Sequence, residues 1–160
     1  MSLPRFPLET RDTPSGPTVW DGIRRQWLTL TPEEQVRQCL IRYLMDFCGV
    51  PKGLMSLEKG LQYDRRKKRY DLLVFDRAGK PFILCECKAP GIQIDDAVLH
   101  QISTYNSSIS ARILLLTNGH QLTAYARMAD GRWKGLALPD PELSGGMTWF
   151  TEAERAFPGH

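Results

Sequence analysis

Two apolar runs on either side of a glycine turn constrain the fold of this chain more than any other feature. Residues 70–76 and 81–88 are rich in the aliphatic and aromatic side chains typical of strands, and Ala78-Gly79-Lys80 supplies the turn between them. A third run of the same kind, at 57–63, precedes them. The sequence therefore predicts a sheet with an antiparallel hairpin at its centre.

Two helices are expected around this hairpin. Thr31 can cap the first one, Pro32 suits its first position, and Glu34 completes a capping box. The helix should end near Cys48, because Gly49 and Pro51 follow. Its apolar face repeats at helical spacing through Val36, Leu40, Tyr43, Leu44 and Phe47.

The second helix is expected over residues 95–106, with Asp95 or Ile94 near its cap. A buried strand over 112–117 follows, closed by Asn118-Gly119, and another strand is expected over 122–127. This order of helix, three strands, helix, strand and strand is typical of an α/β domain with a mixed central β-sheet flanked by helices.

The length of 160 residues, 42% of them hydrophobic, fits a single domain, which we place at 20–138. Residues 1–19 are rich in proline, so we expect a flexible N-terminal arm that forms neither helix nor sheet. From 139 to 160 the composition predicts a loosely packed C-terminal tail, with Trp149 and Phe150 docked back onto the domain.

Composition excludes several classes of protein. The longest apolar run is far shorter than the roughly 20 residues that span a bilayer, and the N-terminus has no apolar signal core, so we expect a soluble, cytoplasmic protein without a membrane partner. The net charge of +3 is too small to identify a partner. The four cysteines lack disulfide-scaffold or zinc-site spacing, which predicts reduced, buried thiols.

Acidic and basic side chains converge at one end of the predicted hairpin. If Asp76 faces Pro81 across the turn, Asp71 falls opposite Glu86, with their Cβ atoms about 4.5 to 5.5 Å apart. Lys88 shares their face, because strand side chains alternate. The opposite face is expected to pack in the core, so that one side of the hairpin is packed and the other carries charge. Its residues are Tyr70, Leu72, Val74, Ile83, Cys85 and Cys87.

This arrangement suits metal-assisted attack on a phosphodiester. Mg²⁺ takes oxygen ligands from one or two carboxylates and keeps waters for a substrate phosphate, so Asp71, Glu86 and the backbone carbonyl of Cys87 are candidate ligands. Lys88 would orient or deprotonate the attacking water. Mn²⁺ is a substitute for Mg²⁺ at such a site. On spacing alone, an ordinary cross-strand ion pair explains the same residues equally well.

Five short motifs in order resemble a known family. The stretches 30–38, 69–74, 86–90, 101–106 and 116–119 are similar to the N-terminal nuclease domain of the restriction subunit of type I restriction enzymes, within the PD-(D/E)XK nuclease superfamily. The resemblance spans about residues 20 to 127. Tyr70 stands where the superfamily name has proline. The resemblance implies a restriction-endonuclease-like core and a Mg²⁺-dependent deoxyribonuclease.

The resemblance also implies further site residues. An acid on the first helix usually joins the metal site, and Glu34 matches that motif best, although Glu33 lies nearer the apolar face on a helical wheel and remains the alternative. Gln101 resembles the first residue of a Gln-x-x-x-Tyr motif that touches the active-site lysine or the substrate, and Tyr105 is its partner. Glu58 matches the family pattern too, with an ordinary strand-edge charge as the alternative.

A run of five cations precedes Asp71, and beside an acidic site we interpret it as a surface for the nucleic-acid backbone. It comprises Arg65, Arg66, Lys67, Lys68 and Arg69, and Arg24, Arg25 and Arg37 extend it. His100, His120 and His160 are scattered and carry no site.

The expected partner is DNA. A homodimer or a restriction-modification protein is a further candidate partner, and no Walker A motif points to a nucleotide cofactor. A nuclease-fold module that binds DNA or a protein without cutting remains the alternative function. The intact Asp71, Glu86 and Lys88 set favours the nuclease.

Overall fold

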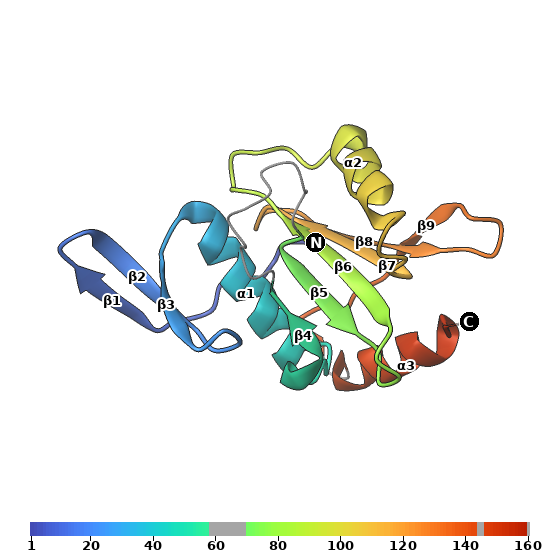
Figure 1. Ribbon diagram of the computed structural model, residues 1–160, viewed down its shortest axis with the longest axis horizontal. Helices are drawn as coiled ribbons and strands as arrows, with labels where there is room; N and C mark the ends of the chain where they lie inside the picture. The colour runs from blue at the N-terminus through green and yellow to red at the C-terminus, as the bar shows by residue number, and fades with distance from the viewer. Residues whose placement is uncertain (58–69, 144–145, 160) are drawn as a thin grey trace.

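A six-stranded mixed sheet forms the centre of the computed structural model, which describes residues 1–57, 70–143 and 146–159. Strands β6 and β7 run parallel, and the other neighbouring strands of this sheet run antiparallel (Figure 1). The expected α/β class with a mixed central sheet is confirmed. In sheet order the strands are β4 (Met55–Ser56), β5 (Leu72–Phe75), β6 (Pro81–Cys87), β7 (Ile113–Thr117), β8 (Leu122–Arg127) and β9 (Trp133–Leu136).

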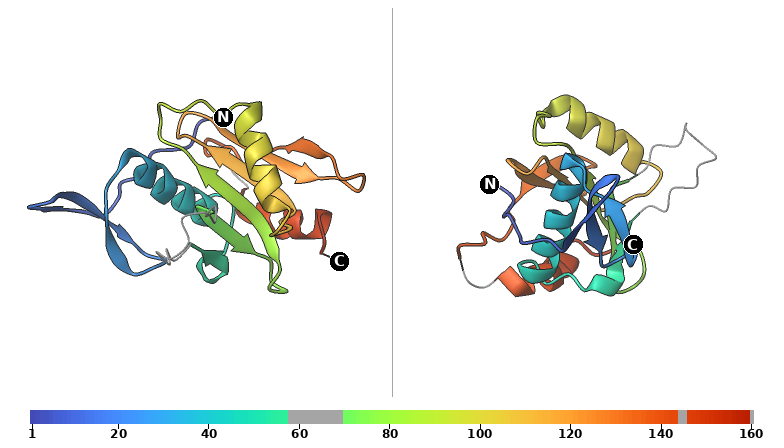
Figure 2. Two further views of the ribbon diagram at one scale, coloured as in Figure 1. Left: turned by 45° about the horizontal axis from the view of Figure 1, so that its top comes forward. Right: turned by 90° about the vertical axis from the view of Figure 1, so that its left-hand side faces the viewer.

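Helices cover both faces of this sheet. Helices α1 (Pro32–Asp46) and α3 (Trp149–Ala156) pack on one face, and α2 (Asp96–Asn106) packs on the other (Figures 1 and 2). Two short 3₁₀ helices, η1 (Lys52–Leu54) and η2 (Gly146–Thr148), precede β4 and α3. No helix within the described ranges combines the length and apolar character needed to cross a membrane.

The first helix begins and ends as its sequence predicts. The Thr31 hydroxyl accepts a hydrogen bond from the Glu34 N–H at 3.1 Å, which satisfies an amide that the helix itself leaves free. The chain leaves the helix through Gly49 at a φ of 72°, where a Cβ would collide with the Met147 carbonyl. The expected capping box forms only in part, and the prediction that Glu34 completes it is wrong. The Glu34 carboxylate accepts hydrogen bonds from side chains of α1 instead.

The hairpin has the predicted register over most of its length. Leu72 pairs with Cys85 and Val74 with Ile83, which is the alignment that brings Asp71 toward Glu86. Next to the turn the prediction is wrong, since Phe75 rather than Asp76 pairs with Pro81. A bulge absorbs the one-residue shift there.

Both faces of the hairpin are packed, which corrects the expectation of one packed and one charged face. The predicted core residues Leu72, Ile83 and Cys85 are fully buried on the α1 side. Leu73 and Leu84, on the other face, are buried beneath α2. Charge is therefore confined to the end of the strands.

The N-terminal segment is not the irregular arm that its prolines suggested. Strands β1 (Thr10–Thr13), β2 (Gly16–Asp21) and β3 (Gln26–Thr29) form an antiparallel sheet that projects beyond α1 (Figures 1 and 2). Pro14 lies in the two-residue loop before Gly16, whose φ is 119°, and Pro17 lies near the start of β2. The prolines therefore shape a hairpin here.

The C-terminal segment is packed more tightly than expected. Phe150 is fully buried in α3 and meets Phe82 edge to face, with ring centroids 5.7 Å apart. The Trp149 indole N–H donates to the Ala137 carbonyl at 3.2 Å. The predicted docking of both aromatic residues is confirmed, and the predicted loose packing is wrong over α3.

Two strands differ from the sequence-based assignment. Strand β9 was not expected, because its four residues carry no sustained alternation. The strand expected at 57–63 lies almost entirely outside the described residues. Strand β4 ends at Ser56, and Leu57 lies outside it.

Candidate functional site

Asp71, Glu86 and Lys88 come together where β5 begins and β6 ends. The Cys87 N–H donates to Asp71 Oδ2 at 2.8 Å, which anchors the carboxylate against the neighbouring strand. Lys88 Nζ lies 3.2 Å from Glu86 Oε1. The side chains of Asp71, Glu86 and Lys88 are 12%, 24% and 26% exposed, so the cluster is partly buried and still accessible to solvent.

The electrostatics of the cluster are dominated by its carboxylates. The pKa of Glu86 is raised to about 7, first by burial and then by the charge of Asp71, against the opposing effect of Lys88. The pKa of Glu33 is also raised, first by burial and then by Asp71. One lysine therefore does not neutralise the acids that face this end of the sheet.

The acids of α1 approach the same place from above the sheet. Glu34 is the buried one, its side chain 6% exposed, and its Oε1 accepts from Gln38 Nε2 at 3.0 Å. Glu33 is 46% exposed. The helical wheel that placed Glu33 nearer the core is therefore wrong, because α1 is buried on more than its apolar stripe.

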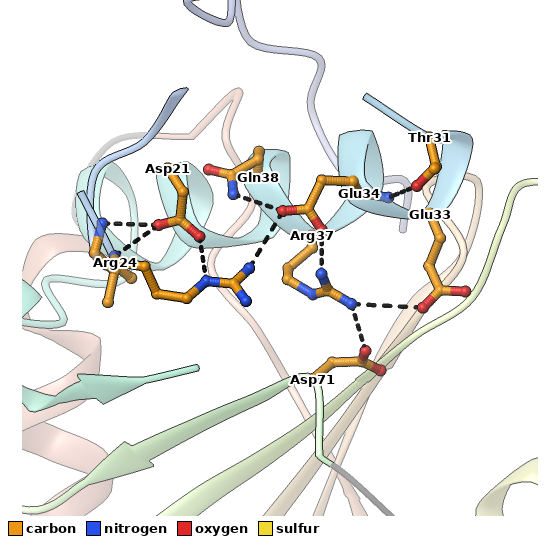
Figure 3. A network of polar contacts seen from close by, with 9 residues as sticks. Asp21, Arg24, Thr31, Glu33, Glu34, Arg37, Gln38 and Asp71 are labelled. Carbon is orange, nitrogen blue, oxygen red and sulfur yellow. Dashed lines mark hydrogen bonds and ion pairs between the residues drawn. The ribbon is translucent and has the colours of Figure 1, made fainter. Parts of the chain in front are cut away.

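Arg37 joins these acids, as Figure 3 shows. Its Nη2 lies 2.7 Å from Asp71 Oδ1 and 3.5 Å from Glu33 Oε1, while Nη1 bonds to Glu34 Oε2. Burial alone would lower the pKa of Arg37, but its hydrogen bond to Asp71 and the charges of Glu34 and Asp71 outweigh burial and raise it. One guanidinium thus bridges α1 and β5.

A second arginine extends this network toward the small sheet. Arg24 Nε lies 2.8 Å from Asp21 Oδ2, and its Nη2 lies 3.6 Å from Glu34 Oε1 (Figure 3). Arg24 and Arg37 were expected to extend a DNA-binding surface, whereas in the structure their guanidinium groups face carboxylates. The spacing of Arg37 from Glu33 and Glu34, four and three residues, was the signal available in the sequence. Arg25 is exposed.

Other predicted residues lie apart from the cluster. Gln101 is exposed on α2 and, among the described residues, has no hydrogen bond to Asp71, Glu86 or Lys88. Tyr105 packs against the apolar cluster beneath α2.

His100 and His120 are exposed, and all four cysteines are buried and free, as predicted. Glu58, the cationic run 65–69 and His160 lie outside the described residues.

The donor set at the site is small. In the described part of the chain, no three His, Cys, Asp or Glu side chains are grouped closely enough to hold a metal ion together. Asp71 and Glu86 are the pair that share one end of the sheet. The Cys87 side chain is buried in the core and its N–H donates to Asp71, so the backbone carbonyl is the candidate ligand atom of this residue.

One comparison with known proteins gives a match. The family model described as "Type I restriction enzyme R protein N terminus (HSDR_N)" matches residues 32–138. The matched region begins at Pro32, the first residue of α1, and extends two residues past β9. No curated protein matches the chain.

Proposed function

The chain belongs to the family of type I restriction enzyme R protein N-termini, and from that premise we propose that it is a metal-dependent DNA endonuclease that hydrolyses phosphodiester bonds. The family supports a restriction-related nuclease role. The observation that carries the proposal is the grouping of Asp71, Glu86 and Lys88 at one end of β5 and β6.

The charge of the site fits a divalent cation. The carboxylates of Asp21, Glu33, Glu34 and Asp71 share the guanidinium groups of Arg24 and Arg37, which leaves the network with surplus negative charge. On the sheet side, the charge of Asp71 adds to the larger effect of burial in raising the pKa of Glu86. Hard cations such as Mg²⁺ or Mn²⁺ prefer these oxygen donors.

Asp71 and Glu86 would hold that cation, with the Cys87 carbonyl as a further oxygen and Glu34 as the proposed acid from α1. Bound there, the cation supplies a Lewis acid that polarises the phosphate and activates the attacking water. The chain's own contribution is positional. The Cys87 N–H fixes Asp71, and Glu86 holds the Lys88 ammonium at the rim, where it can orient the water and stabilise charge that develops on the phosphate.

DNA is the proposed substrate and partner. The cationic run 65–69 ends two residues before Asp71 in the sequence, so it would draw backbone phosphates toward an otherwise repulsive acidic site. Family membership adds other restriction-modification subunits as proposed partners. A single site cuts one strand, so a double-strand break requires a second copy or a second cut.

One observation favours a second candidate, a nuclease-fold module that binds DNA or a partner protein without cutting. Arg37 already neutralises part of the acidic cluster, and no group of three ligand side chains occurs among the residues described. These internal ion pairs compensate part of the acidic charge without a metal ion. Direct measurement of strand cleavage separates the two candidates.

The test is nicking of supercoiled plasmid by the purified protein in Mg²⁺ or Mn²⁺. We expect nicking by the wild type and at least a hundredfold loss in Asp71→Asn and Lys88→Met. The control is Asp130→Asn, which removes an exposed carboxylate on the loop before β9. Nicking that persists in both site variants refutes the site. A folded wild type that binds DNA without nicking it under either metal supports the silent module.

A further inference from the structure

Arg37 has a position that the proposed mechanism does not use. It extends from α1 toward the sheet and contacts Asp71, which lies 34 residues further along the chain, as well as Glu34 on its own helix. Asp71, the proposed metal ligand, directly precedes β5, and Glu34 is the proposed acid on α1. A positively charged group of the chain itself therefore lies against the carboxylates that would hold a divalent cation (Figure 3).

The contacts of Arg37 are almost wholly with these acids. Its Nη atoms bond to Glu34 and Asp71, while its Nε has no hydrogen-bond partner among the described residues. A guanidinium that served to lock the fold would be expected to use its remaining buried donor as well. The side chain is 17% exposed, so water can reach the group when it leaves the acids.

Glu34 does not depend on Arg37 alone. Gln38 Nε2 donates to Glu34 Oε1 at 3.0 Å, and Arg24 Nη2 lies 3.6 Å from the same oxygen. The Cys87 N–H likewise donates to Asp71 Oδ2, the carboxylate oxygen that Arg37 does not contact. Both carboxylates thus remain positioned when the guanidinium moves away.

We infer that Arg37 is a positioning residue that neutralises Glu34 and Asp71 when no divalent cation is bound and competes with the cation for them. The inference rests on the proposed metal site. It makes Arg37 a determinant of cation affinity: the guanidinium keeps the acids from repelling one another in the free protein, and its displacement lowers the affinity for the metal. Arg37 need not touch the substrate.

The experiment measures Mn²⁺ binding to the whole chain by electron paramagnetic resonance, without reference to activity. Arg37→Met is expected to bind Mn²⁺ about tenfold more tightly than the wild type, because removing a nearby positive charge favours a cation even in a well-screened environment. The matched control is Arg42→Met on the same helix. Arg42 pairs with Asp46 at 3.2 Å and is 45% exposed, and its loss should leave the affinity unchanged.

A second comparison protects against loss of folding in Arg37→Met. Glu34→Gln is compared with the double variant Glu34→Gln/Arg37→Met. The double variant leaves less buried charge unpaired than Arg37→Met alone does. The same increase in affinity on removal of Arg37 is expected. A merely structural role for Arg37 predicts weaker binding instead.

The outcomes distinguish the inference from the function on which it rests. Equal or weaker Mn²⁺ binding on removal of Arg37, in folded protein, refutes the inference and leaves the nuclease proposal standing. Both the inference and the nuclease proposal are refuted if the wild type binds no Mn²⁺ and Asp71→Asn gives the same result. Tighter binding in both Arg37 variants, with Arg42→Met unchanged, supports the competition.

Discussion

The titration of Glu86 connects the candidate site to the stability of the whole chain. Burial is the main cause of its raised pKa, and the negative charge of Asp71 adds to that effect. The positive charge of Lys88, whose Nζ lies 3.2 Å away, acts in the opposite direction. Glu86→Gln keeps the size of the side chain and removes the ionisation, so it isolates the energetic consequence.

The sign of the effect follows from proton binding. In the folded protein the pKa of Glu86 is about 7, compared with an ordinary value of 4.5. The folded state therefore holds the proton more tightly, and the stability that this adds is fully present below pH 4.5 and is lost as the pH rises through about 7. At about 1.4 kcal/mol per pH unit, the wild type should lose about 3 kcal/mol relative to Glu86→Gln.

Urea unfolding in the presence of EDTA measures this difference. The free energy of unfolding of both proteins is followed from pH 4.5 to pH 8, and the difference between them is plotted against pH. Carbon-13 NMR of the glutamate carboxyl groups, with Glu86 assigned from the spectrum of the variant, gives the titration independently. A difference in stability that stays constant across this range, or a Glu86 resonance that titrates near the ordinary value, contradicts the reasoning.

Two further predictions concern the elements that position the site. Phe150→Ala should lower the free energy of unfolding by about 3 to 5 kcal/mol, because a fully buried ring against Phe82 is replaced by a cavity; a loss below 1 kcal/mol in urea unfolding would show that α3 does not belong to the core. Thr31→Ala should cost about 1 kcal/mol through the lost cap on the Glu34 amide, whereas Thr31→Ser should restore most of it. Equal stability of the alanine and serine variants contradicts the capping role.

Local pattern was enough to predict the strand pair and its charged end. The turn at Gly79 and the alternation of the flanking runs placed Leu72 opposite Cys85, and hence Asp71 near Glu86 and Lys88. Strand β8 and the caps at Thr31 and Asp95 also follow from neighbours in sequence. Each of these depends on side chains a few residues apart, so periodicity and turn chemistry contain the information.

Other parts of the site could not be predicted in this way. The proline-rich N-terminus forms strands because β2 has a partner on either side, and composition does not reveal such partners. The helical wheel misjudged Glu33 and Glu34 because Arg24 lies beside α1 and compensates the buried acid. Gln101 shares a motif with the expected site but lies exposed on α2.

The amino-acid sequence by itself determined the hairpin that carries Asp71, Glu86 and Lys88, since strand alternation and a tight turn are local properties of the chain. The tertiary structure alone decided that Arg37 meets Asp71. Arg37 contacts Asp71 only because α1 packs across the sheet, and an ion pair between residues 34 positions apart is set by packing. The partial neutralisation of Asp71 by Arg37 is therefore a property of the fold.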